Sequence, residues 1–462
     1  MNSGPARRHG RGLLLRLTIA VTVSAATLFA VLLGARSPHA RRTLVPITQT
    51  PVHLPRTDTG IHIGIPFLRC YNEWWHPTSG GSRWCRTSSR RSIASIQRAI
   101  DIGWTYTYKY AGFVEHHSAI GAAFDFDRTP GYDVDSRTGA GHPFTLAYWR
   151  RSHPDWLEYT CVTDAQGNHT HPAYEYRDVP KVAGAPTYAP VNIADPAVRK
   201  FMFDNYYKPS IDAGYPILFF DNFSLHDFSG RCGHYDLHGH WVAQYSGSRP
   251  WTYERDSLNW LRWVVAETHR YKPGELVAVN YNPAATYDTP QQYDSVYKLV
   301  DIVWNEEGFT YWGNFRLSTA NSWRAEVSAM SDVAQRIDKG LVINGELKKS
   351  YGQVTESDRE WVIANYLLVK GAHTYVGITI PDYGYFWDFP IYHLAIGSPA
   401  GQAHESQNVY VRAFTHGEAI VNPDPSRTIV VHLDRPDYRD TDGRAVPSTL
   451  AVPPVSGVVL IR

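Results

Sequence analysis

The sequence lacks an excess of either charge. Its 45 Lys and Arg residues balance 44 Asp and Glu residues, and the formal net charge is +1. Proteins that bind nucleic acid need basic surface to neutralise phosphates, so we expect no nucleic-acid partner. No Gly-x-Gly-x-x-Gly motif or phosphate-binding loop follows an expected strand, and no Gly-x-Ser-x-Gly motif is present. These absences argue against a nucleotide-binding fold and against Ser-His-Asp catalysis.

Cysteine is scarce. The chain has four cysteines, Cys70, Cys85, Cys161 and Cys232, and no Cys-x-x-Cys pair. An even number is compatible with two disulfides in an exported protein, for which three connectivities exist. Proximity in the sequence favours Cys70–Cys85 and leaves Cys161–Cys232 as the second bond.

The N-terminus has the pattern of an export segment. Arginines flank an uncharged run from Leu17 to Gly34, and Pro38 makes a poor cleavage site. Such a run is at the boundary between a long signal peptide and a short membrane anchor. We expect residues 1–40 to be a signal peptide or an N-terminal membrane anchor, with the anchor favoured, and residues 41–59 to be a linker. The rest of the chain would be extracytoplasmic, either secreted or tethered to the membrane.

Aromatic residues are abundant, with 15 Trp and 30 Tyr. Aromatic faces stack on the C–H faces of sugar rings as readily as they fill apolar cores. The composition therefore favours a carbohydrate ligand without proving one.

From residue 60 onward, strand-like apolar runs alternate with amphipathic helical patterns such as 196–213, 253–271, 322–339 and 356–370. The expected strands are 61–68, 104–110, 157–162, 217–221, 276–281, 301–305, 341–344 and 373–378. This alternation predicts an α/β fold, a (β/α)₈ TIM barrel over residues 60–397. After it, short β-like runs at 408–414, 418–422, 428–433 and 457–461 predict a small antiparallel β-sandwich domain over residues 398–462.

Asp221 is the first candidate for chemistry. The apolar run 216–220 leads directly into Asp221 and Asn222. A strand apolar on both faces is typical of a buried parallel strand, and barrel strands present catalytic groups at their carboxyl ends. The alternative is that this pair only shapes a turn or caps the next helix.

A second carboxylate follows the sixth expected strand, where Glu306 and Glu307 stand side by side. Glycoside hydrolysis uses two carboxylates, one to protonate the leaving oxygen and one to attack the anomeric carbon or activate water. We prefer Glu306 for this role, but spacing alone does not separate it from Glu307, and Glu346 is a third possibility. An exposed acidic turn is the alternative interpretation.

Other polar and aromatic residues at expected strand ends could bind sugar hydroxyls or stack on sugar rings. The candidates for substrate binding are Glu73, Trp74, Trp75, Asn222, Asn280, Asn282, Trp304, Glu307 and Glu346.

Metal chemistry has a weaker signal. The stretch from His226 to His240 contains Cys, His and Asp at short spacing, but no helix fixes them and Cys232 has an expected disulfide role. The acids between Asp125 and Asp135 match no calcium motif. We expect no metal and no cofactor.

Several segments resemble uncharacterised bacterial glycoside hydrolase families with a C-terminal β-domain. They are Asn192–Arg199, Gly214–Asn222, Trp304–Glu306, Arg412–Gly417 and Pro453–Leu460. The families usually have Asp-Gly where this chain has Pro216-Ile217. The resemblance implies a barrel glycosidase of the retaining type, with Asp221 as nucleophile and Glu306 as acid/base. It does not name the sugar.

These observations predict an exported glycoside hydrolase that acts on an extracellular or cell-envelope polysaccharide. Two alternatives are open. One is a glycan-binding envelope scaffold without activity, which the missing acid at Pro216 would explain. The other is a metal-dependent polysaccharide hydrolase or deacetylase that uses the His-rich stretch.

Overall fold

The computed structural model describes residues 54, 56–65, 102–103, 123–125, 151–171, 173, 191–212, 217–220, 223–227, 230–245, 250–379 and 388–462. The chain divides into Met1–Gln49 and Thr50–Arg462, and every described residue belongs to the second unit. The expected export segment and the expected Cys70–Cys85 bond lie outside the described residues. No helix in the described part has the length and apolar character needed to cross a bilayer.

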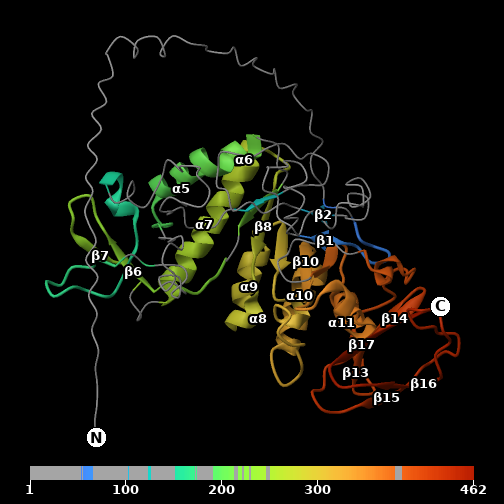
Figure 1. Cartoon of the computed structure of the whole chain (residues 1–462). Helices are drawn as coiled ribbons and strands as arrows, with labels where there is room; N and C mark the ends of the chain where they lie inside the picture. The colour runs from blue at the N-terminus through green and yellow to red at the C-terminus, as the bar shows by residue number, and fades with distance from the viewer. Residues whose placement is uncertain are drawn as a thin grey trace, which may run out of the picture. The chain divides into compact units, whose positions relative to one another are not determined.

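A parallel sheet forms the centre of the chain (Figure 1). Its six strands, in spatial order, are β11 (Thr374–Thr379), β10 (Gly340–Glu346), β9 (Ile302–Asn305), β8 (Leu276–Asn280), β5 (Ile217–Phe220) and β3 (Ala123–Asp125). A second parallel pair, β1 (Gly64–Ile65) and β2 (Ile102–Gly103), follows at the β11 edge, because Ile63 bridges Val376 in parallel. The parallel α/β sheet is as predicted. Closure of a barrel would need β2 to meet β3, a pairing outside those described, so the barrel stays a prediction.

The prediction that residues 157–162 form the third strand of the parallel sheet is wrong. Within 157–162 the structure has only β4 (Tyr159–Thr160), which pairs antiparallel with β6 (Arg231–Tyr235) in a separate sheet. The third place in the parallel sheet belongs to β3, whose residues 123–125 pair with β5. A strand as short as β3 has no readable alternation. Residues 157–162 have the apolar residues of a strand, but β4 belongs to the separate antiparallel sheet.

Helices occur at the four expected segments that the structure describes, and two further helices lie between β8 and β9. In chain order they are α5 (Pro196–Met202), η3 (Phe203–Tyr207), α6 (Lys208–Asp212), α7 (Pro250–Tyr271), α8 (Pro283–Thr286), α9 (Pro290–Tyr297), α10 (Trp323–Ser331), η5 (Asp332–Arg336) and α11 (Glu356–Val369). Short 3₁₀ turns are η1 (Pro154–Trp156), η4 (Gly308–Thr310), η6 (Tyr351–Gln353) and η7 (Pro390–His393).

Two helices begin with the capping residues by which a helix start can be predicted from sequence. The Asp195 side chain accepts a hydrogen bond from Ala197 N at 2.7 Å, with Pro196 at the first helical position. Thr355 and Asp358 form a reciprocal capping box at the start of α11. Each satisfies backbone N–H groups that the first helical turn leaves without partners.

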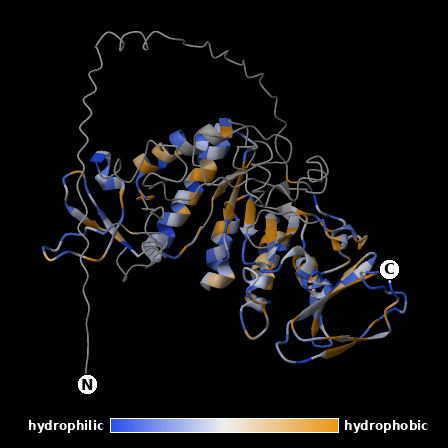
Figure 2. Ribbon diagram, viewed as in Figure 1, coloured by the Kyte–Doolittle hydropathy of each residue, from blue (hydrophilic) through white to orange (hydrophobic). Residues whose placement is uncertain are grey.

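Side chains on the parallel sheet alternate between two apolar layers. The inner layer contains Ile217, Phe219, Ala278, Ile302, Trp304, Val342 and Tyr375. Their strand neighbours, such as Phe220, Val279, Val303 and Ile343, belong instead to the large cluster shared with the helices. Figure 2 shows strands such as β8 mainly in the apolar colour, while α7 carries both colours along its length. Burial on both faces is what makes these strands continuous apolar runs in the sequence.

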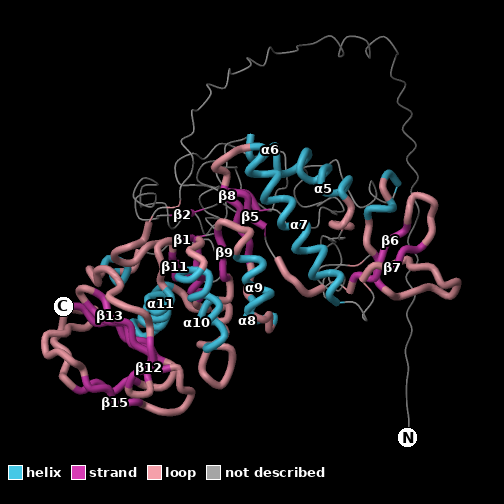
Figure 3. The backbone as a smooth tube through the Cα atoms, turned by 180° about the vertical axis from the view of Figure 1, so that it is seen from behind, coloured by secondary structure: helices cyan, strands magenta, loops and turns pink. Residues whose placement is uncertain are grey.

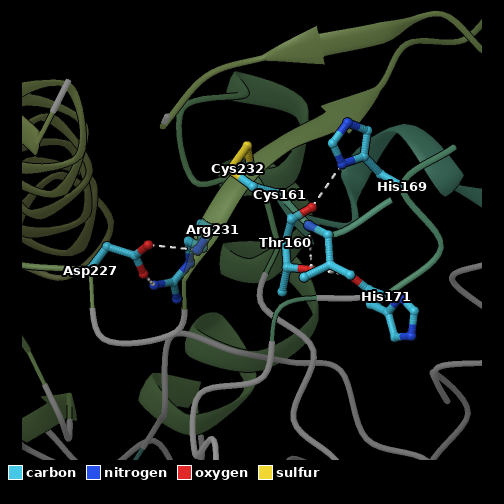
Figure 4. Close-up of a disulfide and its surroundings, with 8 residues drawn as sticks. Thr160, Cys161, His169, His171, Asp227, Arg231 and Cys232 are labelled. Carbon is cyan, nitrogen blue, oxygen red and sulfur yellow. Dashed lines mark hydrogen bonds and ion pairs between the residues drawn. A yellow bond between two sulfur atoms is a disulfide. The ribbon is translucent and has the colours of Figure 1, made fainter. Parts of the chain in front are cut away.

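A small antiparallel sheet precedes α7. It consists of β4, β6 and β7 (Trp241–Ala243), and the Cys161–Cys232 disulfide joins its first two strands (Figure 4). This disulfide confirms the second expected bond. Beside it, Arg231 forms ion pairs with Glu158 and Asp227 at 2.7 and 2.8 Å.

The C-terminal residues form two antiparallel sheets, as predicted (Figure 3). One contains β12 (His404–Ser406), β13 (Val409–Phe414), β14 (Gly417–Asn422) and β17 (Ser456–Ile461), and the other β15 (Ile429–His432) and β16 (Thr449–Val452). A separate apolar cluster that includes Val411, Ile420 and Val431 unites residues of both sheets.

The C-terminal sheet packs on α11. The buried Arg412 guanidinium donates hydrogen bonds to the carbonyls of Leu367, Leu368 and Lys370, at the end of the helix, where carbonyls lack helical partners. Gly457 lies so close to α11 that a Cβ atom there would be 2.8 Å from the Glu360 carbonyl oxygen. The helix α11 thus packs on the parallel sheet with one side and on the C-terminal sheet with the other. This explains why it is apolar around most of its circumference.

Candidate active site

The two-residue alternation of the strands decides which side chains reach the inner face at the carboxyl edge of the sheet. Ala278, Trp304 and Val342 belong to the inner layer. Two positions further along the same strands stand Asn280, Glu306 and Asn344. Side chains two positions apart share a face, so these three polar groups continue the inner layer toward the edge.

Hydrogen bonds join these groups across four neighbouring strands. Asn280 Nδ2 donates to Glu306 Oε2 at 2.8 Å, and Asn344 Nδ2 donates to the Glu306 carbonyl oxygen at 2.8 Å. Thr379 Oγ1 in turn donates to Asn344 Oδ1 at 2.8 Å. We call Asn280, Glu306, Asn344 and Thr379 the polar layer. Two different strands therefore fix Glu306, one through its carboxylate and one through its backbone.

Glu307 lies on the opposite face. It is 7% exposed, and it follows by two positions Asn305, whose amide donates a hydrogen bond to Glu326 of α10 on the helix side of the sheet. Burial and then the charge of Glu306 raise the pKa of Glu307 to about 7. Burial and then Glu307 raise the pKa of Glu326 to about 8, although Asn305 donates a hydrogen bond to it. Glu306, by contrast, is partly exposed.

The buried position of Glu307 predicts a pH-dependent stability. An unfolded glutamate loses its proton near pH 4.5, whereas folded Glu307 keeps it to about pH 7. The contribution of Glu307 to the free energy of unfolding is therefore fully present below pH 4.5 and is lost as the pH rises to 7. Glu307→Gln, which imitates the protonated form, should match wild type at pH 4.5 and exceed its free energy of unfolding by roughly 2 to 3 kcal/mol at pH 8.

Urea denaturation at both pH values measures this difference. Glu405 is exposed, so Glu405→Gln should leave the pH dependence as in wild type. A Glu307→Gln variant that loses stability between pH 4.5 and 8 as steeply as wild type would contradict the assignment.

Glu346 lies on the same face as Asn344, two residues further along β10, and is 5% exposed. The residue between them, Gly345, is on the other face, because a Cβ atom there would be 2.4 Å from Val362 of α11. Glu346 is thus a second described carboxylate at the inner edge of the sheet.

Two expected sugar-binding residues, Trp304 and Asn282, make structural contacts. Trp304 is fully buried in the inner layer, where its ring packs 5.5 Å from Phe219, so it has no face available to a sugar. Asn282 caps α8, where its Oδ1 accepts a hydrogen bond from Ala285 N. The sequence does not distinguish a Trp that supports the site from one that lines it, since both occupy strand ends.

A paired histidine and aspartate were not expected. His226 Nε2 lies 2.6 Å from Asp288 Oδ1, and the Asp288 side chain has no exposed surface. Asp288 Oδ2 accepts hydrogen bonds from Tyr281 and Thr286 at 2.6 and 2.8 Å. The sequence directed attention to His226 as part of a His-rich stretch, whereas its partner is 62 residues away.

Within the described residues, no group of three or more His, Cys, Asp or Glu side chains is arranged to hold a metal ion. Cys232 is in a disulfide and His226 pairs with Asp288. The described part of the His-rich stretch thus uses these side chains for structure.

Five expected site residues lie outside the described residues. They are Glu73, Trp74, Trp75, Asp221 and Asn222. Their roles, and the separation of Asp221 from Glu306, stay predictions.

Residues 272–418, which include the polar layer, match the family described as hypothetical glycosyl hydrolase family 15. Over this segment the chain is similar to a glycosyl hydrolase family. The match covers β8 to β11, the strands that provide the polar layer. No curated protein matches the chain.

Solved structures with a similar chain course include a mutant of the trehalulose synthase MutB, at 10% identity, 88% coverage of this chain, 99% coverage of that chain and a TM-score of 0.49. The isomaltulose synthase of Erwinia rhapontici NX5 has 10% identity, coverages of 87% and 98%, and a TM-score of 0.47. An Anoxybacillus α-amylase has 10% identity, coverages of 74% and 76%, and a TM-score of 0.39. These scores are too low to carry an argument about activity or substrate.

Proposed function

We propose that this protein is a glycoside hydrolase that uses Glu306 as general acid/base and Asp221 as nucleophile. The observation that supports this most is the position of Glu306, a partly exposed carboxylate fixed at the inner edge of a parallel sheet by Asn280 and Asn344. Carboxylates at this edge are where parallel-barrel enzymes carry out chemistry. Glu307 is buried and shares the helix-side alternation of Asn305, which favours Glu306 between the two.

The proposed nucleophile follows from the same alternation. Ile217 and Phe219 belong to the inner layer, so residue 221 is the next position of β5 expected on that face. β8 alone separates β5 from β9. Strands are about 4.8 Å apart, so two side chains that incline toward each other across one strand can reach the ~5 to 5.5 Å carboxyl separation of a retaining enzyme.

The proposed reaction has two steps. Protonated Glu306 gives its proton to the glycosidic oxygen while Asp221 attacks the anomeric carbon, so that the leaving sugar departs as an alcohol and a glycosyl ester forms on Asp221. Glu306, now ionised, takes a proton from water, and the resulting hydroxide equivalent releases the sugar from Asp221. Asn280 orients the Glu306 carboxylate in the second step, when that group accepts hydrogen bonds.

We further propose an extracellular or cell-envelope polysaccharide as the substrate, because the export pattern at residues 1–40 and the Cys161–Cys232 disulfide both suit an oxidising compartment. The test is release of reducing ends from a panel of envelope and extracellular polysaccharides by the full chain, with the anomer of the first product read by proton NMR. Release with retained configuration is expected. Binding without release across the whole panel would favour the glycan-binding scaffold.

A further inference from the structure

The loop after β9 contains three aromatic side chains within residues 311–315, of which Phe315 is exposed and Tyr311 and Trp312 are half-buried. Phe315 is 49% exposed, and its ring stacks on Tyr311 with centroids 4.7 Å apart. The Trp312 ring lies 4.9 Å from Tyr311. From the loop after β8 comes Tyr287, which is 89% exposed and ends α8, seven residues beyond Asn280 of the polar layer. We call Tyr287, Tyr311, Trp312 and Phe315 the aromatic rim.

The backbone holds the aromatic rim in an unusual conformation. Tyr287, Tyr311 and Trp312 have φ angles of 59°, 45° and 51°. Side chains with a Cβ atom avoid this left-handed region, at a cost of roughly 1 to 2 kcal/mol each, and bulky residues are rarely found there. Turn chemistry alone would place Gly or Asn at such positions. Three aromatic residues there are better explained by a use for their rings.

The loop is also fixed against the carboxyl end of β10. Gly308 and Gly313, both with positive φ, approach it so closely that a Cβ atom would be 1.7 Å from the Asn344 carbonyl oxygen and 2.7 Å from Lys348 N, respectively. Lys348 Nζ also donates a hydrogen bond to Asn314. Asn344 belongs to the polar layer, so the rim and the candidate site share one framework.

We propose that the aromatic rim is a binding subsite for the sugar rings of a glycan chain, next to the bond that is cleaved. Rigid rings stack on the apolar C–H faces of a pyranose, and the adjacent Lys348 and Asn314 provide hydrogen-bonding groups suited to its hydroxyls. The substrate is therefore a chain of several sugar units. The aromatic rim binds units other than the one at which the bond is cleaved. This inference rests on the proposed function for the position of the cleaved bond.

The test separates recognition of the chain from chemistry. Tyr287→Asn removes a ring and keeps a residue that tolerates positive φ, and Phe315→Ala removes the second exposed ring. Tyr287→Phe and Phe315→Tyr keep the rings. Val430→Ala shortens an exposed apolar side chain in β15 and serves as the matched control. Thermal unfolding of each full-length variant checks that it is folded.

Hydrolysis is measured on a nitrophenyl monosaccharide and on hexasaccharides of glucose with α-1,4, β-1,4 and β-1,3 linkages. Each ring-removing variant should lose about ten-fold in kcat/KM on the hexasaccharide that wild type cleaves best, while the monosaccharide is unaffected. Ring-keeping variants and Val430→Ala should behave as wild type. Equal hexasaccharide kinetics in all variants would overturn the inference and leave the proposed function standing.

Calorimetry of the same hexasaccharides with Glu306→Gln tests binding without turnover. Adding Tyr287→Asn should weaken binding about ten-fold. This result together with no hydrolysis by wild type would support the subsite and reject the proposed function. Absence of binding by any hexasaccharide would overturn the inference.

Discussion

Glu306→Gln is expected to lower kcat for an unactivated glycoside by roughly 10³-fold while the chain stays folded. The amide keeps an oxygen that can accept the Asn280 hydrogen bond, but it has no proton to give to the leaving oxygen. A nitrophenol leaves without protonation, so the first step on a nitrophenyl glycoside should be affected much less. Comparison of the two substrates by initial rates therefore reports on the acid role and not only on binding.

Glu307→Gln is the matched control for this prediction, since it makes the same chemical change one residue away. Its side chain is buried and shares the helix-side alternation of Asn305, so activity should stay within about two-fold of wild type. Thermal unfolding of both variants excludes loss of fold. If Glu307→Gln inactivates the protein and Glu306→Gln does not, the two glutamates have been assigned the wrong way round.

The parts of the fold that could be predicted are those in which a strand is long and buried on both faces. β5, β8, β9, β10 and β11 are such strands, and each was expected within a few residues. β3 was missed because three residues carry no periodic signal, and a more apolar segment elsewhere took its place in the prediction. The C-terminal strands were readable because turn residues separate them.

The candidate site was predictable in outline and not in detail. Polar residues at the ends of buried strands identified Asn280, Glu306 and Glu346, which lie together on the inner face. Glu306 and Glu307 are distinguished by the register of β9 in the sheet. A shift of one position changes the face on which a side chain lies. The aromatic rim depends on backbone φ angles and the Asp288 pair on a contact between distant residues, neither of which local sequence patterns report.

A buried charge cluster stabilises the small antiparallel sheet of β4, β6 and β7. Arg231 is 7% exposed and forms ion pairs with Glu158, which is fully buried, and with Asp227. Its guanidinium lies 5.0 Å from the Tyr253 ring and donates to the Tyr253 hydroxyl at 3.3 Å. One cation thus connects the segments that carry β4, β6 and α7. Figure 4 shows Arg231 and Asp227 beside the disulfide.

At pH 9, Arg231→Met should lower the free energy of unfolding by about 3 to 5 kcal/mol, as measured by urea denaturation under oxidising conditions. Methionine fills much of the same volume but leaves Glu158 buried without a cation, and burial already raises the pKa of Glu158 to about 8 against the opposing effect of Arg231. The variant must therefore keep Glu158 protonated over a wider pH range, and its loss should be larger at pH 9 than at pH 6.

Arg56→Met is the comparison for Arg231→Met, because Arg56 pairs with Asp58 at 2.7 Å while both side chains are more than half exposed. An exposed ion pair contributes little to the free energy of unfolding, because water and salt screen it, so the loss should be correspondingly small. Equal losses in the two variants would show that burial of the cation has no special effect. A different outcome is that Arg231→Met loses the same free energy of unfolding at pH 6 and pH 9. That result would mean that lost packing, and not the unpaired carboxyl group of Glu158, destabilises the antiparallel sheet.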